Sequence, residues 1–157
     1  MKPSLCHFFG ILLVVSAAVV VAGCNSGGKS PAMNTTNVQS LVLYDVDPRE
    51  VPNYSDLLTN LSSHPLKPQE VQLVFANTKE ESLHIWKGAL LGVAECKDGR
   101  KYHLAISNFG GFARVLETGQ SIRFVGASGV EWERIQSVAL RDVFIPARQR
   151  KNQAEGR

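Results

Sequence analysis

Cys96 and His103 are the residues of this chain whose types and spacing suggest nucleophilic chemistry. A thiol and an imidazole form a nucleophile–base pair when they lie within hydrogen-bond reach, about 3 Å. Asp98-Gly99 separates two runs of alternating apolar residues, and this pattern predicts a β-hairpin over Leu90–Ser107. A two-residue turn would place Cys96 and His103 diagonally on one face, with Cα atoms about 7–8 Å apart.

The same register places Lys101 directly opposite Cys96, where a positive charge would lower the pKa of the thiol. The sequence shows no third group to orient His103 and no oxyanion donor. The pattern therefore favours Cys96 as a half-exposed surface residue and predicts no catalytic residue. A thiol site formed by Cys96 and His103 is the alternative.

The register of the hairpin decides which side chains face the core. With a two-residue turn, one face carries Leu91, Val93, Tyr102, Leu104 and Ile106, and we expect this to be the core face. A three-residue loop with a bulge would shift the pairing by one residue and mix the two faces. The two-residue turn keeps the apolar side chains of both strands together on one face, so we expect that turn.

Several other side chains could ligate a metal ion. His84, His103 and Cys96 share none of the short spacings typical of metal ligands. Asp45 and Asp47 would lie on one face of a strand, where two carboxylates suit a hard cation, but a strand end entering a turn has the same pattern. We therefore predict no metal site and no cofactor.

Aromatic residues offer a further candidate for binding. A groove for a glycan or a peptide could be lined by Trp86, Phe109, Phe112 and Trp132. In a small β domain such side chains more often belong to the core, because they bury a large apolar area. We expect core packing for most of them.

Near the N-terminus, Gly23, Gly28, Lys29 and Ser30 match the phosphate-binding loop pattern G-x-x-x-x-G-K-[ST]. That loop must open a helix whose N-terminus faces the phosphate. Pro31 and a polar run follow instead, without the apolar period of a helix, and the chain lacks repeated strand–helix units. We therefore predict that the chain binds no nucleotide.

The same region has the layout of a secretory signal peptide. Lys2 precedes the uncharged apolar run Phe8–Ala22, and small residues follow. The sequence Val21-Ala22-Gly23-Cys24 resembles the lipobox of bacterial lipoproteins. This resemblance implies transfer of diacylglycerol to the Cys24 thiol and cleavage after Gly23. It also implies attachment to the cell membrane or outer membrane, with the protein facing the periplasm or the exterior.

A transmembrane anchor is the competing interpretation, since residues 5–28 carry no charge when His7 is neutral. Asn25, Ser26 and the glycines end the apolar run early, whereas a span needs about 18 or more apolar residues.

The chain has 17 basic and 14 acidic residues, a formal charge of +3. Removal of residues 1–23 takes away Lys2 alone among them and leaves +2, too little for a nucleic-acid-binding domain.

The chain divides into four predicted parts: a signal peptide at residues 1–23, a flexible tether at 24–37, a globular domain at 38–147 and a polar basic tail at 148–157. Strands are predicted at Val38–Val46, Ala113–Leu116, Ser121–Val125 and Leu140–Ile145, and a short helix at Ser55–Leu61. Glu70–Phe75 and Val130–Ile135 are each open between strand and helix; Trp132, Ile135 and Ala139 would line the latter helix.

Turn signals every 10–15 residues or so predict a mainly β fold, a small antiparallel meander or barrel-like sheet. An α+β fold with one or two short helices is the alternative. The expected function is that of a lipid-anchored envelope protein with a non-catalytic binding or structural domain. Its partners would be the membrane, through acylated Cys24, and an envelope polymer or protein. A small envelope thiol enzyme using Cys96 and His103 is the alternative function.

Overall fold

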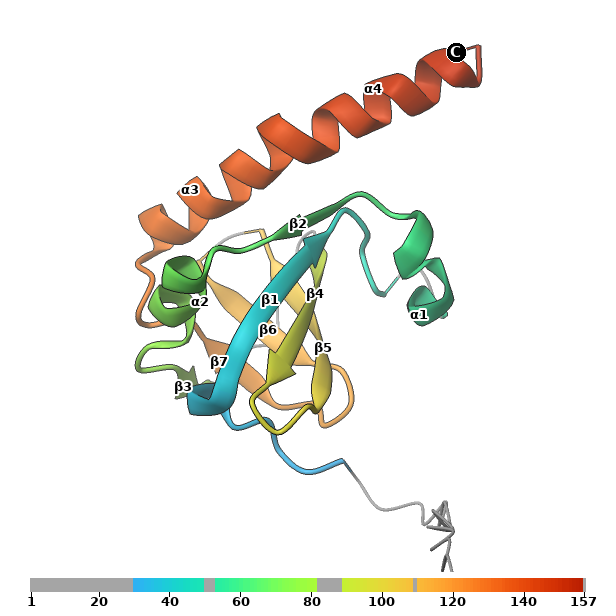
Figure 1. Ribbon diagram of the computed structural model, residues 1–157. Coiled ribbons are helices and arrows are strands. Elements are labelled where there is room, and N and C mark those ends of the chain that lie inside the picture. Colours follow the sequence, from blue (N-terminus) through green and yellow to red (C-terminus); the bar gives the residue numbers. More distant parts are fainter. Residues whose placement is uncertain (1–29, 50–52, 82–88, 109, 157) are drawn as a thin grey trace, which may run out of the picture.

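The computed structural model describes residues 30–49, 53–81, 89–108 and 110–156. Within these ranges seven strands form one open antiparallel sheet, in the order β2-β1-β4-β5-β6-β7-β3 (Figure 1). The strands are β1 (Val38–Tyr44), β2 (Ser63–Pro65), β3 (Lys79–Glu80), β4 (Ala89–Cys96), β5 (Lys101–Ser107), β6 (Phe112–Val115) and β7 (Ser121–Arg123). The predicted antiparallel β fold is confirmed as an open sheet with added helices.

Four α-helices accompany the sheet in the described ranges: α1 (Tyr54–Leu57), α2 (Pro68–Phe75), α3 (Gly129–Ala139) and α4 (Ile145–Ala154). A π-helical turn, Leu140–Phe144, joins α3 to α4, and short 3-10 segments cover Thr35–Asn37 and Leu58–Asn60. The helix predicted over Ser55–Leu61 is present as α1 and the 3-10 segment that follows it.

Helix α2 settles the open prediction for Glu70–Phe75. Its buried side chains are Val71, Val74 and Phe75, at spacings of three and one that place them on one side of a helix. Pro68 stands in the first turn, where its missing N–H costs nothing, and the Glu70 carboxylate accepts the backbone N–H of Lys67 at 2.9 Å. Burial of this apolar side is what favours helix over strand.

The core lies on one face of the sheet, which we call the inner face. It includes Leu41 and Leu43 of β1, Ala94 and Cys96 of β4, and Tyr102, Leu104 and Ile106 of β5. The opposite or outer face is marked by Val42, Val93 and His103, which lie side by side in the register of β1, β4 and β5. Trp132 and Phe144 of the C-terminal helix join the core on the inner face.

The predicted β4–β5 hairpin is confirmed, but its predicted register is wrong. Glu95 pairs with Lys101 and Val93 with His103, one residue away from the expected pairing. The backbone N–H of Gly99 donates to the Cys96 carbonyl (2.9 Å), and Gly99 has φ +81°. This is a three-residue loop closed by a glycine in the left-handed region, which no other residue adopts as readily.

A physical reason for the misassignment is that β4 is buried on both faces. Leu91 on the outer face and Ala94 on the inner face are both fully buried. A strand covered on both sides does not alternate clearly between apolar and polar residues, so its pattern does not report which face is the core. The second predicted hairpin is present as paired β6 and β7.

The C-terminal predictions are corrected in two places. The segment Val130–Ile135 is helical, and Trp132, Ile135 and Ala139 of α3 are buried as its helical interpretation required. The strand predicted at Leu140–Ile145 is wrong, because these residues continue the helix through the π turn. The polar tail predicted from residue 148 is helical as far as Ala154, and the joined helix runs past the sheet (Figure 1).

Pro146 was the signal that misled the prediction, since proline usually ends a helix. In the π turn the backbone N–H of Ile145 donates to the carbonyl of Leu140, five residues earlier. Pro146 then lies at the start of α4, where its missing donor leaves the hydrogen-bond ladder least disturbed.

The predicted tether is shorter than expected on its domain side. Met33 is buried, and its backbone N–H donates to the Gln120 side chain at 3.0 Å. The Tyr102 hydroxyl donates to the Pro31 carbonyl at 3.2 Å. Residues 31–37 therefore belong to the packed domain, and residues 24–29 lie outside the described residues.

Candidate functional site

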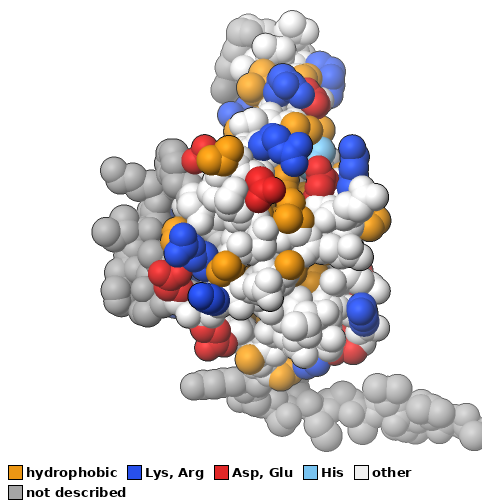
Figure 2. All heavy atoms as spheres, turned by 90° about the vertical axis from the view of Figure 1, so that its left-hand side faces the viewer, with side chains coloured by type: hydrophobic (Ala, Val, Ile, Leu, Met, Phe, Trp, Pro, Cys, Tyr) orange, Lys and Arg blue, Asp and Glu red, His pale blue; other side chains and the backbone are white. Residues whose placement is uncertain are grey.

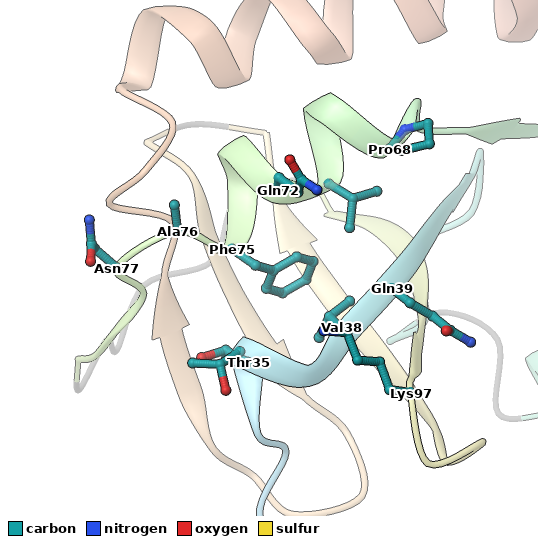
Figure 3. A pocket seen from close by; sticks show the side chains of 11 residues that line it. Thr35, Val38, Gln39, Pro68, Gln72, Phe75, Ala76, Asn77 and Lys97 are labelled. Atoms are coloured by element: carbon teal, nitrogen blue, oxygen red, sulfur yellow. The ribbon is translucent and has the colours of Figure 1, made fainter.

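An open groove of about 380 Å³ lies between α2 and the start of β1 (Figure 3). Residues from the N-terminal 3-10 segment, β1, α2, the turn after α2 and the β4–β5 loop line it: Thr35, Thr36, Val38, Gln39, Pro68, Val71, Gln72, Phe75, Ala76, Asn77 and Lys97. In Figure 3 the Phe75 ring lies at the centre of the floor. Asn77 and Thr35 lie at one end, and Gln39 and Lys97 at the other.

The walls of this groove are held by local backbone geometry. Asn77 adopts φ +54°, the left-handed conformation in which helices commonly end, and it turns the chain after α2. The Thr78 hydroxyl donates to the Thr35 hydroxyl at 2.5 Å, which joins the turn after α2 to the segment that precedes β1. The groove is therefore bounded by two segments that are far apart in the sequence and tied together in the fold.

The lining of the groove determines what chemistry it supports. Phe75 and Val71 form a floor that is 5% and 3% exposed, and other carbon-rich side chains of the lining extend it, so most of the accessible lining is apolar. The polar groups are hydroxyls and amides, and Lys97 alone among the lining residues is charged. The lining includes no carboxylate, imidazole or thiol, so it offers hydrogen bonds to a ligand rather than acid–base or nucleophilic catalysis.

Cys96 lies in the core rather than half-exposed as predicted. Its side chain is 2% exposed and belongs to the inner face with Ala94 and Tyr102. Burial raises the pKa of the Cys96 thiol, and the negative charge of Asp98 adds to this effect. A raised pKa keeps the thiol protonated, whereas a nucleophilic cysteine requires the thiolate.

The structure does not bring Cys96 and His103 together. In the observed register Tyr102 shares the inner face with Cys96, so its neighbour His103 points to the outer face. Lys101, expected opposite Cys96, instead lies opposite Glu95, with Nζ 3.8 Å from that carboxylate. The one-residue correction in register therefore removes the predicted thiol pair.

His103 has a different partner, which the sequence did not indicate. Its ring Nδ1 lies 2.6 Å from Glu117 Oε1, and its backbone N–H donates to both carboxylate oxygens at 3.0 and 3.1 Å. Burial raises the pKa of the Glu117 carboxyl, but hydrogen bonds from the His103 ring and from backbone N–H groups outweigh this effect and lower the pKa overall. Glu117 follows β6, so only the pairing of β5 with β6 brings it to His103.

The predicted carboxylate pair does not face a common site. Asp45 accepts hydrogen bonds from Arg148, and Asp47 accepts from Arg49 Nε at 2.8 Å. Each carboxylate thus has an arginine partner, which is typical of ion pairs at the end of a strand. Among the described residues no three histidine, cysteine, aspartate or glutamate side chains form a group that could hold a metal ion.

The aromatic candidates do not form a groove among the residues that the structure describes. Trp132 is fully buried and its Nε1 donates to the Ser107 carbonyl at 3.4 Å. Phe112 is half-buried beneath Arg123, whose guanidinium carbon lies 5.2 Å from the ring centre. Trp86, Phe109 and His84 lie outside the described residues.

The N-terminal candidates, namely Cys24 and the phosphate-loop residues Gly23, Gly28 and Lys29, also lie outside the described residues. In the described part of the chain, none of the helices combines the length and apolar composition that a membrane span requires. Comparison of the chain with protein-family models, with curated proteins and with solved structures finds no match.

Proposed function

We propose that this chain is a lipid-anchored protein of the bacterial cell envelope whose domain binds a ligand without catalysing a reaction. The observation that carries the proposal is the sequence Val21-Ala22-Gly23-Cys24 at the end of the uncharged run Phe8–Ala22. Diacylglycerol on Cys24 supplies two acyl chains, which is enough for stable attachment to a membrane. The mature chain would face the periplasm or the exterior.

Chain length limits how far the domain can lie from such an anchor. Met33, which is already buried in the domain, lies nine positions after Cys24. At full extension these residues reach about 30 Å. The domain would therefore act on an envelope polymer or protein that lies within a short distance of the membrane.

The groove between α2 and β1 supports a binding role. Its accessible lining combines a larger apolar part with hydroxyls and amides such as Gln72 and Asn77, and with one cation, Lys97. These groups both donate and accept hydrogen bonds, so they match the hydroxyls of a glycan or the amides of a peptide. The alternative function, a thiol enzyme, gains no support, because Cys96 is buried and faces away from His103.

Mass spectrometry of the protein expressed in a bacterium tests the anchor. We expect a mature chain that begins at Cys24 and carries the mass of diacylglycerol, found in the membrane fraction. Cys24→Ala should abolish both the lipid and the membrane association. An unmodified Cys24 in a chain that still begins at Met1 would refute this part of the proposal.

Nuclear magnetic resonance tests the groove, with soluble cell-wall glycan fragments added to the labelled full chain in neutral detergent. We expect chemical-shift changes confined to the groove and saturable with fragment concentration. Asn77→Gly removes the amide while tolerating φ +54°, and it should weaken binding. Gln72→Ala should do the same, whereas Gln69→Ala, an exposed position of α2 outside the groove, should not. Equal effects of all three variants would refute binding in the groove.

A further inference from the structure

The C-terminal helix carries a second surface, separate from the groove between α2 and β1. Past Phe144, the last buried residue of the joined helix, α4 runs beyond the sheet (Figure 1). The 10 residues of α4 include no buried side chain. A helix that is polar on all sides gains little from packing, so burial in the core does not account for its presence.

A hollow of about 460 Å³ lies between α4 and residues 60–62. On the α4 side it is lined by Ala147, Arg148, Arg150 and Lys151. Facing them are the amide, apolar and hydroxyl side chains of residues 60–62, with Asp45 at the end of β1. The hollow thus combines cations, neutral hydrogen-bonding groups and carbon surface.

One ion pair holds the α4 wall of the hollow in place. Arg148 Nε donates to Asp45 Oδ2 at 2.5 Å, and its Nη2 donates to the other oxygen of the same carboxylate. Such a two-point contact fixes direction as well as distance. Because Arg148 neutralises Asp45, the positive charge offered to a ligand comes from Arg150 and Lys151. Lys151 makes one loose contact, 3.9 Å from Glu155.

We propose that this α4 hollow docks an acidic segment of a partner protein. Carboxylates of that segment pair with Arg150 and Lys151, and its backbone amides bond to the polar side chains of residues 60–62. Leu61 and Ala147 contact the carbon atoms of the segment's side chains. A polyphosphate presents charge without carbon groups, and the broad surface of an anionic membrane does not enter a hollow bounded by two segments, so the mixed lining favours a peptide.

The face shown in Figure 2 presents a different arrangement. Acidic and basic side chains are interspersed there, and hydrophobic ones are scattered. An extended acidic ligand laid across that face would meet carboxylates as well as cations. Attraction by the cations and repulsion by the carboxylates offset each other along an extended ligand, which leaves little net attraction.

Fluorescence anisotropy tests the proposal, with a labelled peptide that alternates Glu with Leu and Ala titrated with the full chain in neutral detergent. We expect saturable binding that weakens as salt is added. The double variant R150A/K151A should weaken binding about fivefold to tenfold. The matched control is the double variant K67A/R134A, which also removes one lysine and one arginine. Both positions are exposed and lie outside the hollow, so this variant should change binding less than about twofold.

Three outcomes would overturn the proposal: no saturable binding, equal weakening by both double variants, or tighter binding to polyphosphate or phosphatidylglycerol vesicles than to the peptide. Circular dichroism of each variant establishes that the fold is retained. The lipid on Cys24 is measured separately by mass, so the peptide result and the result for the anchor can fail independently.

Discussion

The inner and outer faces of the β4–β5 hairpin differ in how their side chains are held. On the inner face Cys96 and Leu104 lie in a dry core, where close packing and burial determine stability. On the outer face His103 and Glu117 are half-buried and are held by hydrogen bonds. Neighbouring residues of one strand therefore have different physical roles. A side chain contributes to core packing on the inner face, whereas it can form hydrogen bonds with partly exposed partners on the outer face.

The largest effect that separates the two faces should come from removing carbon from the core. Leu104→Ala on the inner face should lower the free energy of unfolding by about 3 kcal/mol, because it opens a cavity at a fully buried site. Leu116→Ala, on the half-buried outer side next to His103, should cost about 1 kcal/mol. Urea denaturation measures both, and equal losses would contradict the distinction between the faces.

Cys96→Ser provides the next test and should lower the free energy of unfolding by about 2 kcal/mol, because it places a hydroxyl in the core without a partner. Cys96→Ala should destabilise less, because it leaves only a small void. The raised pKa of the thiol also predicts that iodoacetamide modifies native Cys96 more slowly than a peptide thiol at pH 8. Modification at the peptide rate or faster would restore the thiol site.

Glu117→Gln tests the outer face and should cost about 1 kcal/mol at pH 7, a modest loss because water reaches the pair. The folded pKa of Glu117 is lowered, so its contribution is present above the unfolded value and is lost as pH falls through the folded pKa. The wild-type protein should therefore lose more stability than the variant from roughly pH 5 to pH 3. Parallel pH profiles would show that the contact does not stabilise the fold.

An effect of similar size concerns the loop that sets which residues face inward. Gly99→Ala should destabilise by about 1 kcal/mol, because alanine tolerates φ +81° poorly although no atom lies near enough to clash. Gly99→Asn should recover about half of this loss, since asparagine adopts the left-handed region more readily. Thermal denaturation measures both variants, and a neutral Gly99→Ala would argue against the three-residue loop.

Local sequence signals predicted several parts of the fold. The Asp98-Gly99 turn between apolar runs identified the hairpin, and the spacing of Trp132, Ile135 and Ala139 matched the helix that forms. These signals depend on neighbours within a few residues. The register of the hairpin was missed because β4 is covered on both faces, and coverage depends on the helices and loops that pack there.

The candidate groove was not predictable in the same way. Thr35 and Thr78 share a hydrogen bond although 43 positions separate them, and Gln72 reaches the groove only because α2 packs beside β1. No short motif marks such a site. Its polar side chains, taken singly in the sequence, are ordinary surface residues.

The sequence by itself determined the resemblance around Cys24, the antiparallel β character and the places where the chain turns, because each depends on residue types that are adjacent in the chain. The tertiary structure decided that Cys96 is buried, that His103 pairs with Glu117 and that α4 continues past Pro146. Those outcomes depend on register and on packing between distant segments. A shift of one residue in pairing turns a side chain from one face to the other, so composition and spacing alone do not settle which residues meet.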